Sequence, residues 1–207
     1  MTGPATFWRS DAPLILASGS ATRRQLLEAA GLPVEVIRPD VDERAIEADY
    51  LAMGGSPASV AAALADAKAL SVSPSYPGRT VLAADQMLVC EGRPFHKPED
   101  AAAAERQIAT LAGRKHELTS AFTLARDGRI IGRGASTAVL AMRPLTPGFI
   151  RNYVALAGPA ATSSVGGYQL EGLGIHLFET IEGDHSTILG LPMLSLLATL
   201  RELDLVA

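Results

Sequence analysis

Two adjacent arginines stand in the opening turn of an expected helix, directly after a small polar turn. Arg23 and Arg24 follow the Ser-Gly-Ser segment at 18–20, which itself follows the apolar run 14–17. The partial positive charge at a helix N-terminus disfavours cations by up to about 1 kcal/mol, so two arginines there need a reason. Backbone N–H groups and hydroxyls of such a turn can bind an anion. The pattern indicates a phosphate-binding site, and a solvated helix start is the alternative.

Carboxylates occur at two places that suit metal binding or acid–base chemistry. Asp85 is expected at the C-terminal end of the apolar strand 81–84, the edge at which ligand-facing residues of α/β sheets lie. Asp40, Asp42 and Glu43 form an acidic cluster whose oxygens suit Mg²⁺ or Mn²⁺. A turn-capping aspartate and a solvated acidic turn are the alternatives for these two places.

Two lysines add candidate cations. Lys68 lies in an alanine-rich helix that Ser56 and Pro57 begin and that should run to about residue 70. Lys97 directly precedes a second helix, expected over 98–111. Taken alone, each could be an ordinary solvated lysine. We expect both Arg23 and Lys97 to occupy surface-accessible helix starts.

Composition limits the classes of partner. A formal charge of −4 and a pI near 5.6 argue against nucleic acid or an anionic membrane, because Lys and Arg hold such partners. Cys90 is the only cysteine, so no intramolecular disulfide or thiolate zinc cluster can form, which fits a reducing compartment. The longest apolar stretch, 189–200, contains Pro192 and is shorter than the roughly 20 residues that span a bilayer. We expect a soluble, cytoplasmic protein.

The elements that must position these side chains alternate between strands and helices. Strands are expected over 14–17, 34–37, 81–84 with a continuation over 87–89, 118–125, 130–140 and 175–181, and helices over 23–30, 56–70, 98–111, from 147, and 192–203. Asp127-Gly128 predicts a hairpin turn, and 158–174 is expected as a glycine-rich loop. Crossover and hairpin connections together favour an α/β fold with a partly parallel sheet.

The order and spacing of these signals resemble the Maf family of nucleotide pyrophosphatases. The resemblance covers roughly residues 14–203, and its matching segments are 14–27, 39–43, Lys68 in Ala-Lys-Ala, Ala84-Asp85, 96–98, 113–117, 172–174, and 182–184 with 190–192. It implies an elongated, two-lobe, mixed-sheet Maf/inosine-triphosphatase-like fold with a central cleft. It also implies a single domain over residues 1–207 that pairs as a homodimer.

The resemblance further implies an activity and a set of site residues. The activity is hydrolysis of nucleoside triphosphates to the monophosphate and pyrophosphate, with Mg²⁺ or Mn²⁺ as cofactor. Asp85, Glu43 and Lys97 are the expected catalytic residues, the two carboxylates also being the expected metal ligands. Asp85 is our choice of general base, although the two carboxylate roles can be exchanged. The expected substrate contacts are Ser18, Ser20, Thr22, Arg23, Arg24, Lys68, Gln86 and Glu171. A nucleotide-binding regulator of cell division without turnover is the alternative.

Three positions bear on the preferred base. Thr22 stands where the pyrimidine branch of the family has arginine and the 7-methyl-GTP branch has tryptophan, whereas Gln86 and Glu171 are similar to the 7-methyl-GTP branch. A carboxylate only accepts hydrogen bonds, which matches the adjacent N1–H and N2–H₂ donors of guanine and mismatches the carbonyls of uracil and thymine. We therefore predict a preference for guanine-type triphosphates, including 7-methyl-GTP, over UTP and dTTP. Without tryptophan, discrimination of the methylated base should be blunted.

Overall fold

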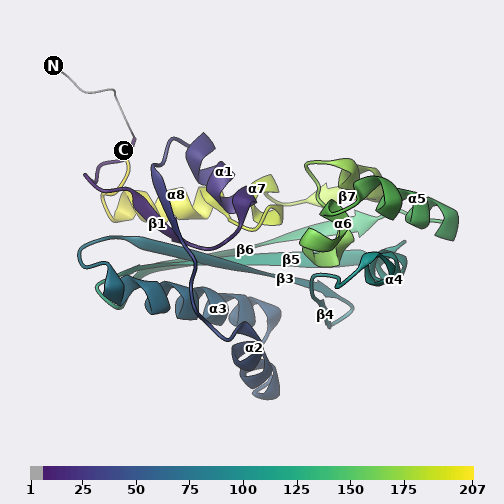
Figure 1. Ribbon diagram of the computed structural model, residues 1–207, viewed down its shortest axis with the longest axis horizontal. Helices are drawn as coiled ribbons and strands as arrows, with labels where there is room; N and C mark the ends of the chain where they lie inside the picture. Colours follow the sequence, from purple (N-terminus) through teal and green to yellow (C-terminus); the bar gives the residue numbers. More distant parts are fainter. Residues whose placement is uncertain (1–6) are drawn as a thin grey trace. The chain divides into compact units, whose positions relative to one another are not determined.

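The computed structural model describes residues 7–207 and shows helices packed on one mixed sheet (Figure 1). Its strands are β1 (Leu14–Ala17), β2 (Val34–Ile37), β3 (Val81–Cys90), β4 (Arg93–Phe95), β5 (Lys115–Arg126), β6 (Arg129–Met142) and β7 (Phe178–Glu182). They lie in the order β2-β1-β3-β5-β6-β7, and β4 pairs with β3. β1 is parallel to β2 and β3, whereas β7 is antiparallel to β6. The predicted α/β class with a partly parallel sheet is confirmed.

Helices connect most of the strands. They are α1 (Ala21–Ala29), α2 (Glu43–Ala52), α3 (Pro57–Val72), α4 (Ala101–Leu111), α5 (Pro147–Ala157), α6 (Ala160–Ser163), α7 (His185–Ile188) and α8 (Met193–Glu202), with 3₁₀ turns η1 (Ser73–Ser75), η2 (Val165–Gly167) and η3 (Leu173–Leu177). Ser56 and Thr146 cap α3 and α5, each followed by proline, as their sequences predict. Within residues 7–207, no helix is both long and apolar enough to cross a membrane.

The chain divides into two compact units. The first unit contains the residues up to Gln86, Ser120–Ser136 and Gly190–Ala207. The second unit contains Met87–Thr119 and Thr137–Leu189. Each unit has its own hydrophobic core.

Side chains of the first unit alternate between two packed faces. One face of β1 and β3 packs against α1 and α8, and the other packs against α3, which lies on the opposite side of these strands (Figure 1). The α3 face holds Ile15, Ala17, Val81 and Ala83, whereas the other face holds Leu14, Leu16, Leu82 and Ala84. Because strand residues two apart share a face, Asp85 continues the row that faces α3.

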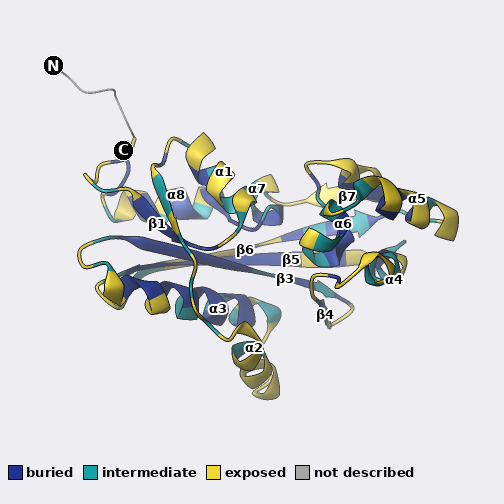
Figure 2. Ribbon diagram, in the orientation of Figure 1, coloured by how far each residue is buried: buried dark blue, intermediate teal, exposed yellow. Residues whose placement is uncertain are grey.

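Helix α2 is an element that the sequence analysis did not predict. Asp42, expected in an acidic turn, accepts a hydrogen bond from the backbone N–H of Ala45 and is the N-cap of this helix. None of the ten residues of α2 is buried, and Figure 2 shows its outer turns as exposed. A helix without a buried face lacks the apolar periodicity from which helices are recognised.

Three expectations in the second unit need correction. Helix α4 begins at Ala101 rather than at residue 98, because the Asp100 carboxylate accepts from the N–H of Ala103 and caps the helix there. The expected loop 158–174 contains α6, η2 and the start of η3. Residues 175–177, expected as the start of a strand, belong to η3. Short helical turns of this kind carry too few residues to show a period.

A buried histidine marks the core of the second unit. The Nε2 atom of His116 lies 2.7 Å from the hydroxyl of Tyr168, and both rings pack near Phe178. Burial lowers the pKa of His116 to about 4, so the ring is neutral at pH 7. This histidine therefore supports packing and contributes no charge at neutral pH.

Candidate functional site

Asp85 lies inside a strand and not at its end. β3 continues to Cys90, so the expectation of a strand-end aspartate is wrong. The position is nevertheless special, because the parallel partner β1 ends at Ala17 and pairs with β3 only at Val81 and Leu82. Beyond that pairing, β1 no longer lies beside β3, and the Asp85 carboxylate on the α3 face meets a side chain of that helix.

Lys68 of α3 is the partner of this carboxylate. Its Nζ atom lies 2.5 Å from Oδ1 of Asp85 and 2.9 Å from Oε1 of Glu43. The Lys68 side chain is 7% exposed and that of Asp85 13%, whereas Glu43, at the first turn of α2, is 55% exposed. Burial at this level strengthens the attraction between the charges and makes an unpaired partner costly. The three side chains, from three elements, form the centre of the candidate site.

Arg23 is a second cation of the same cluster. Burial lowers the pKa of the Arg23 guanidinium, and the negative charges of Asp85 and Glu43 partly offset this effect. Its Nη1 donates to the carbonyl of Ala84 at 2.7 Å, and its Nε donates to the carbonyl of Gly190 at 2.8 Å. The side chain of Arg23 therefore links β3 to the segment before α8, and with intermediate exposure it is less accessible than the sequence analysis expected.

The contact between Gly190 and Arg23 was not predicted from the sequence. It has φ +95°, and a Cβ atom there would lie 3.3 Å from Nε of Arg23. Its membership of the Gly-Leu-Pro motif at 190–192 was the available signal. Glycine at this place allows the carbonyl and the guanidinium to approach closely.

The hydroxyl of Ser18 is oriented by two donors. Its Oγ accepts from the backbone N–H of Ser20 and from Nη1 of Arg23, each at 3.2 Å. A serine oxygen has two acceptor lone pairs and one O–H donor. With both lone pairs used, the remaining hydrogen is free to donate to an anion. Ser18 therefore has the right polarity for a phosphate oxygen.

Arg23 should matter for stability as well as for binding. We expect Arg23→Lys to lower the free energy of unfolding by about 1–3 kcal/mol, because a lysine cannot satisfy both carbonyls that the guanidinium satisfies. Arg24→Lys is the matched control, since Arg24 makes only a half-exposed i,i+4 pair with Glu28 and should change stability by less than about 0.5 kcal/mol. Urea unfolding measures both variants. Equal midpoints for the two variants would contradict the linking role of Arg23.

The other predicted contacts of the first unit surround the Ser-Gly-Ser turn or β3. Ser20 caps α1 by accepting from the N–H of Arg23, and Thr22 lies half-buried in the first turn of that helix. Gln86 ends the first-unit part of β3, and its Nε2 donates to the hydroxyl of Ser120 at 3.0 Å. Ser120 is fully buried and was not predicted, since no spacing in the sequence relates it to Gln86.

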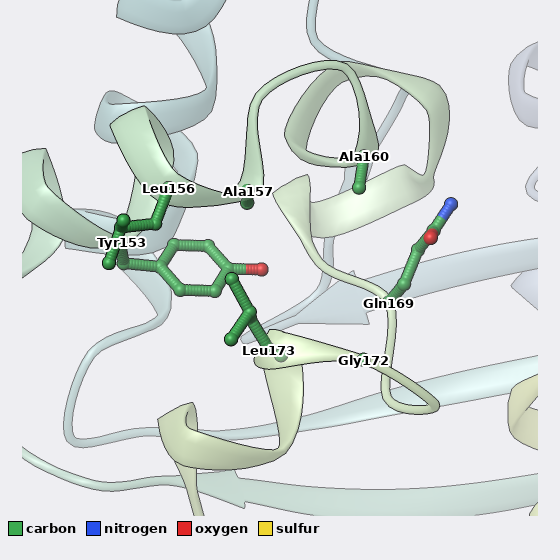
Figure 3. A pocket seen from close by; sticks show the side chains of 8 residues that line it. Tyr153, Leu156, Ala157, Ala160, Gln169, Gly172 and Leu173 are labelled. Carbon is green, nitrogen blue, oxygen red and sulfur yellow. The ribbon is translucent and has the colours of Figure 1, made fainter.

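Two predicted residues belong to the second unit. Lys97 is exposed and is separated from α4 by three residues, and Glu171 is exposed between Leu170 and η3. The second unit also has a hollow of about 190 Å³ whose wall includes Gly172, the residue after Glu171. Figure 3 shows Tyr153, Gln169 and Leu173 around it. The hydroxyl of Tyr153 donates to the carbonyl of Gly167, and burial raises the pKa of Tyr153 to about 12. Glu171 itself does not line this hollow.

Two carboxylates of the candidate site could bind a divalent cation. Among residues 7–207, no group of three or more His, Cys, Asp or Glu side chains is arranged to hold a metal ion. Asp85 and Glu43 supply two carboxylates that converge on a single positive atom, Nζ of Lys68. Mg²⁺ is commonly bound by one or two carboxylates together with water and substrate phosphates. Two converging carboxylates fit that pattern of binding.

The chain is an α/β protein with a buried cluster of carboxylates and cations beside the turn that contains Ser18. This combination is typical of proteins that bind phosphate groups. Residues 13–203 match the family described as "Maf-like protein", and the chain belongs to this family.

Relatives match over nearly the full chain. The "Nucleoside triphosphate pyrophosphatase" of Rhodopseudomonas palustris (strain BisB18) is 52% identical over 98% of this chain and 99% of its own length. The "7-methyl-GTP pyrophosphatase" of Mesorhizobium japonicum is also 52% identical, over 92% of this chain and 96% of its own. The solved Ham1 protein of Staphylococcus aureus aligns with a TM-score of 0.43 and 15% identity, over 63% of this chain and 72% of that one.

Proposed function

We propose that this protein hydrolyses nucleoside triphosphates to the monophosphate and pyrophosphate. The observation that carries the proposal is the cluster in which Lys68 is held between Asp85 and Glu43 beside Arg23. The names of the relatives that match almost the whole chain support the same activity. By family resemblance, Lys97 remains a proposed catalytic residue and Glu171 a proposed substrate contact. A homodimer and a cytoplasmic location are also proposals.

The negative charge of the triphosphate is the main obstacle to this reaction, and the cations of the cluster can neutralise part of it. A triphosphate repels an attacking water until its negative charges are neutralised and the water is positioned. In the proposal, Ser18 donates its free hydrogen to a phosphate oxygen, and Lys68 and Arg23 face the charge that develops on the phosphate. Asp85 accepts the proton of the attacking water, with Glu43 as the alternative acceptor. Pyrophosphate then leaves with the electron pair of the broken P–O bond.

A divalent cation is the cofactor that we propose for this site. Asp85 and Glu43 would hold it. When bound, such a cation neutralises phosphate charge and lowers the pKa of a bound water. Lys68 contacts both carboxylates in the structure, so its ammonium group must be able to shift toward substrate when another cation takes its place.

Turnover separates the proposal from a nucleotide-binding regulator without catalysis. Purified protein is assayed for pyrophosphate release from GTP, 7-methyl-GTP, UTP and dTTP in the presence of Mg²⁺ or Mn²⁺. We expect release in water alone, which also separates hydrolysis from transfer to an acceptor. Tight binding without release across the whole panel would favour the regulator and contradict the proposal.

The preferred base is proposed to be guanine or its 7-methyl form. Glu171→Gln should lower the ratio of kcat/KM for GTP over UTP by about tenfold or more, because a charged hydrogen bond contributes about 1.5–3 kcal/mol. Glu179→Gln, an exposed glutamate of β7 in the same unit, is the control. Steady-state kinetics on both nucleotides measure the ratio. A wild-type preference for UTP or dTTP would contradict the proposed base preference but not the proposed hydrolase activity.

A further inference from the structure

Helix α3 carries Lys68 but has few large side chains to fix its orientation. Four of its eight buried residues are alanines, and Val60, Leu64 and Val72 are the bulkier apolar ones. Shape complementarity of large side chains is what normally selects one packing among several. Alanine methyl groups contribute little to such selection. Polar contacts can therefore have a large share in setting the direction in which Lys68 points.

Asp66 supplies polar contacts that hold this helix to the sheet. Its Oδ1 accepts from the hydroxyl of Thr123 in β5 at 2.6 Å and from Nε of Arg133 in β6 at 2.8 Å. Its Oδ2 accepts from Nη2 of Arg133, also at 2.8 Å. A two-point contact between a guanidinium and a carboxylate fixes geometry as well as supplying attraction. Thr123 is fully buried, so its hydroxyl depends on this carboxylate.

The two polar anchors of α3 lie on different flanks of the helix. At 3.6 residues per turn, Asp66 and Lys68 project about 160° apart around the axis. Asp66 reaches β5 and β6, whereas Lys68 reaches Asp85 in β3. A turn of α3 about its axis therefore breaks one anchor or the other.

We propose that Asp66, through Thr123 and Arg133, is a positioning residue that sets the rotation of α3 and thereby aims Lys68 at Asp85 and Glu43. The consequence for activity rests on the proposed function. A side-chain tip lies about 6 Å from a helix axis, so a turn of about 10° moves it by roughly 1 Å. A misplacement of that size costs up to about 10²-fold in rate.

The test uses Asp66→Asn, which keeps an oxygen for Thr123 but loses the charge and the two-point contact with Arg133. Arg133→Gln, which removes the other half of the pair, is the second variant, because the Arg133 side chain is half-exposed and its loss should leave the fold intact. Glu35→Gln is the matched control, since it breaks a comparable ion pair with Arg79. The two charged atoms of that pair lie 2.8 Å apart, and neither residue belongs to α3. Thermal melting confirms that each variant is folded.

The first measurement needs no turnover. The chain has three lysines, and Lys97 and Lys115 are exposed while Lys68 is buried. The intact protein is treated briefly with acetic anhydride, and the acetylation of each lysine is measured by peptide mass spectrometry. In Asp66→Asn, we expect Lys68 to react at least about threefold faster relative to Lys97 and Lys115, because a helix free to turn exposes it more often. Arg133→Gln should shift in the same direction, and Glu35→Gln should not.

The second measurement is the split between kcat and KM for GTP. We expect Asp66→Asn to lower kcat by about fivefold to tenfold and to change KM by less than about twofold. The reason is that Lys68 no longer points at the charge that develops on the phosphate, whereas substrate binding is kept. Unchanged Lys68 reactivity in both folded variants would overturn the positioning role. Altered reactivity in a protein whose wild type shows no turnover would support that role and contradict the proposed function instead.

Discussion

Replacing Asp85 by asparagine should lower turnover by at least about 10²-fold, the usual scale for losing a positioned acid–base group. Asparagine has the shape of aspartate but can neither take a proton from water nor neutralise a cation. The fold should tolerate the change, because Lys68 keeps its contact with Glu43 at 2.9 Å. Pyrophosphate release at saturating GTP, measured beside thermal melting, gives both quantities.

Two further variants make the Asp85 result interpretable. Asp100→Asn is the control, because this residue caps α4 and asparagine caps a helix as well as aspartate does. Glu43→Gln tests the exchange of the two carboxylate roles, and a larger loss there than in Asp85→Asn would make Glu43 the base. If Asp85→Asn melts and turns over like wild type, Asp85 has no catalytic part.

Local signals in the sequence predicted the elements that have strong caps or turns. Ser56-Pro57, Thr146-Pro147 and the Asp127-Gly128 hairpin each fix backbone geometry through the residues themselves, and each is confirmed. Helix α2 was missed because it buries no side chain, and β3 was expected as two segments, 81–84 and 87–89, because the charge of Asp85 interrupts its apolar run. These errors share one cause, since neither segment shows the uninterrupted apolar pattern from which elements are recognised.

The same distinction applies to the candidate site. The family resemblance selected Lys68, Asp85 and Glu43, and the structure brings these three together. Spacing could not show that Arg23 is occupied by the carbonyls of Ala84 and Gly190, which lie 61 and 167 positions away. A residue type indicates which chemistry a side chain can perform. Only the fold determines whether other groups of the protein already bind that side chain.

Removing the lysine between the two carboxylates should have a large effect on stability. Lys68→Met keeps the length of the side chain but leaves the buried carboxylate of Asp85 without its closest cation. Breaking a buried pair from one side costs about 3–5 kcal/mol, so urea unfolding should shift by that order. Glu43 is half-exposed and can be rehydrated, so most of the cost falls on Asp85. Lys97→Met, at an exposed position, should leave stability unchanged.

The same variant tests whether Asp85 and Glu43 form the divalent-cation site. Without the ammonium group, two converging carboxylates are left that a divalent cation can neutralise. If the variant binds Mg²⁺ with a dissociation constant of about 1 mM, 10 mM Mg²⁺ stabilises it by about 1.4 kcal/mol, which raises Tm by roughly 3–5 °C for a chain of this size. Wild type, whose carboxylates already hold Lys68, should shift less, and NaCl at equal ionic strength should not reproduce the difference. The double variant Lys68→Met/Asp85→Asn should lose the response. Equal Mg²⁺ shifts in wild type, Lys68→Met and the double variant would show that the cation binds elsewhere.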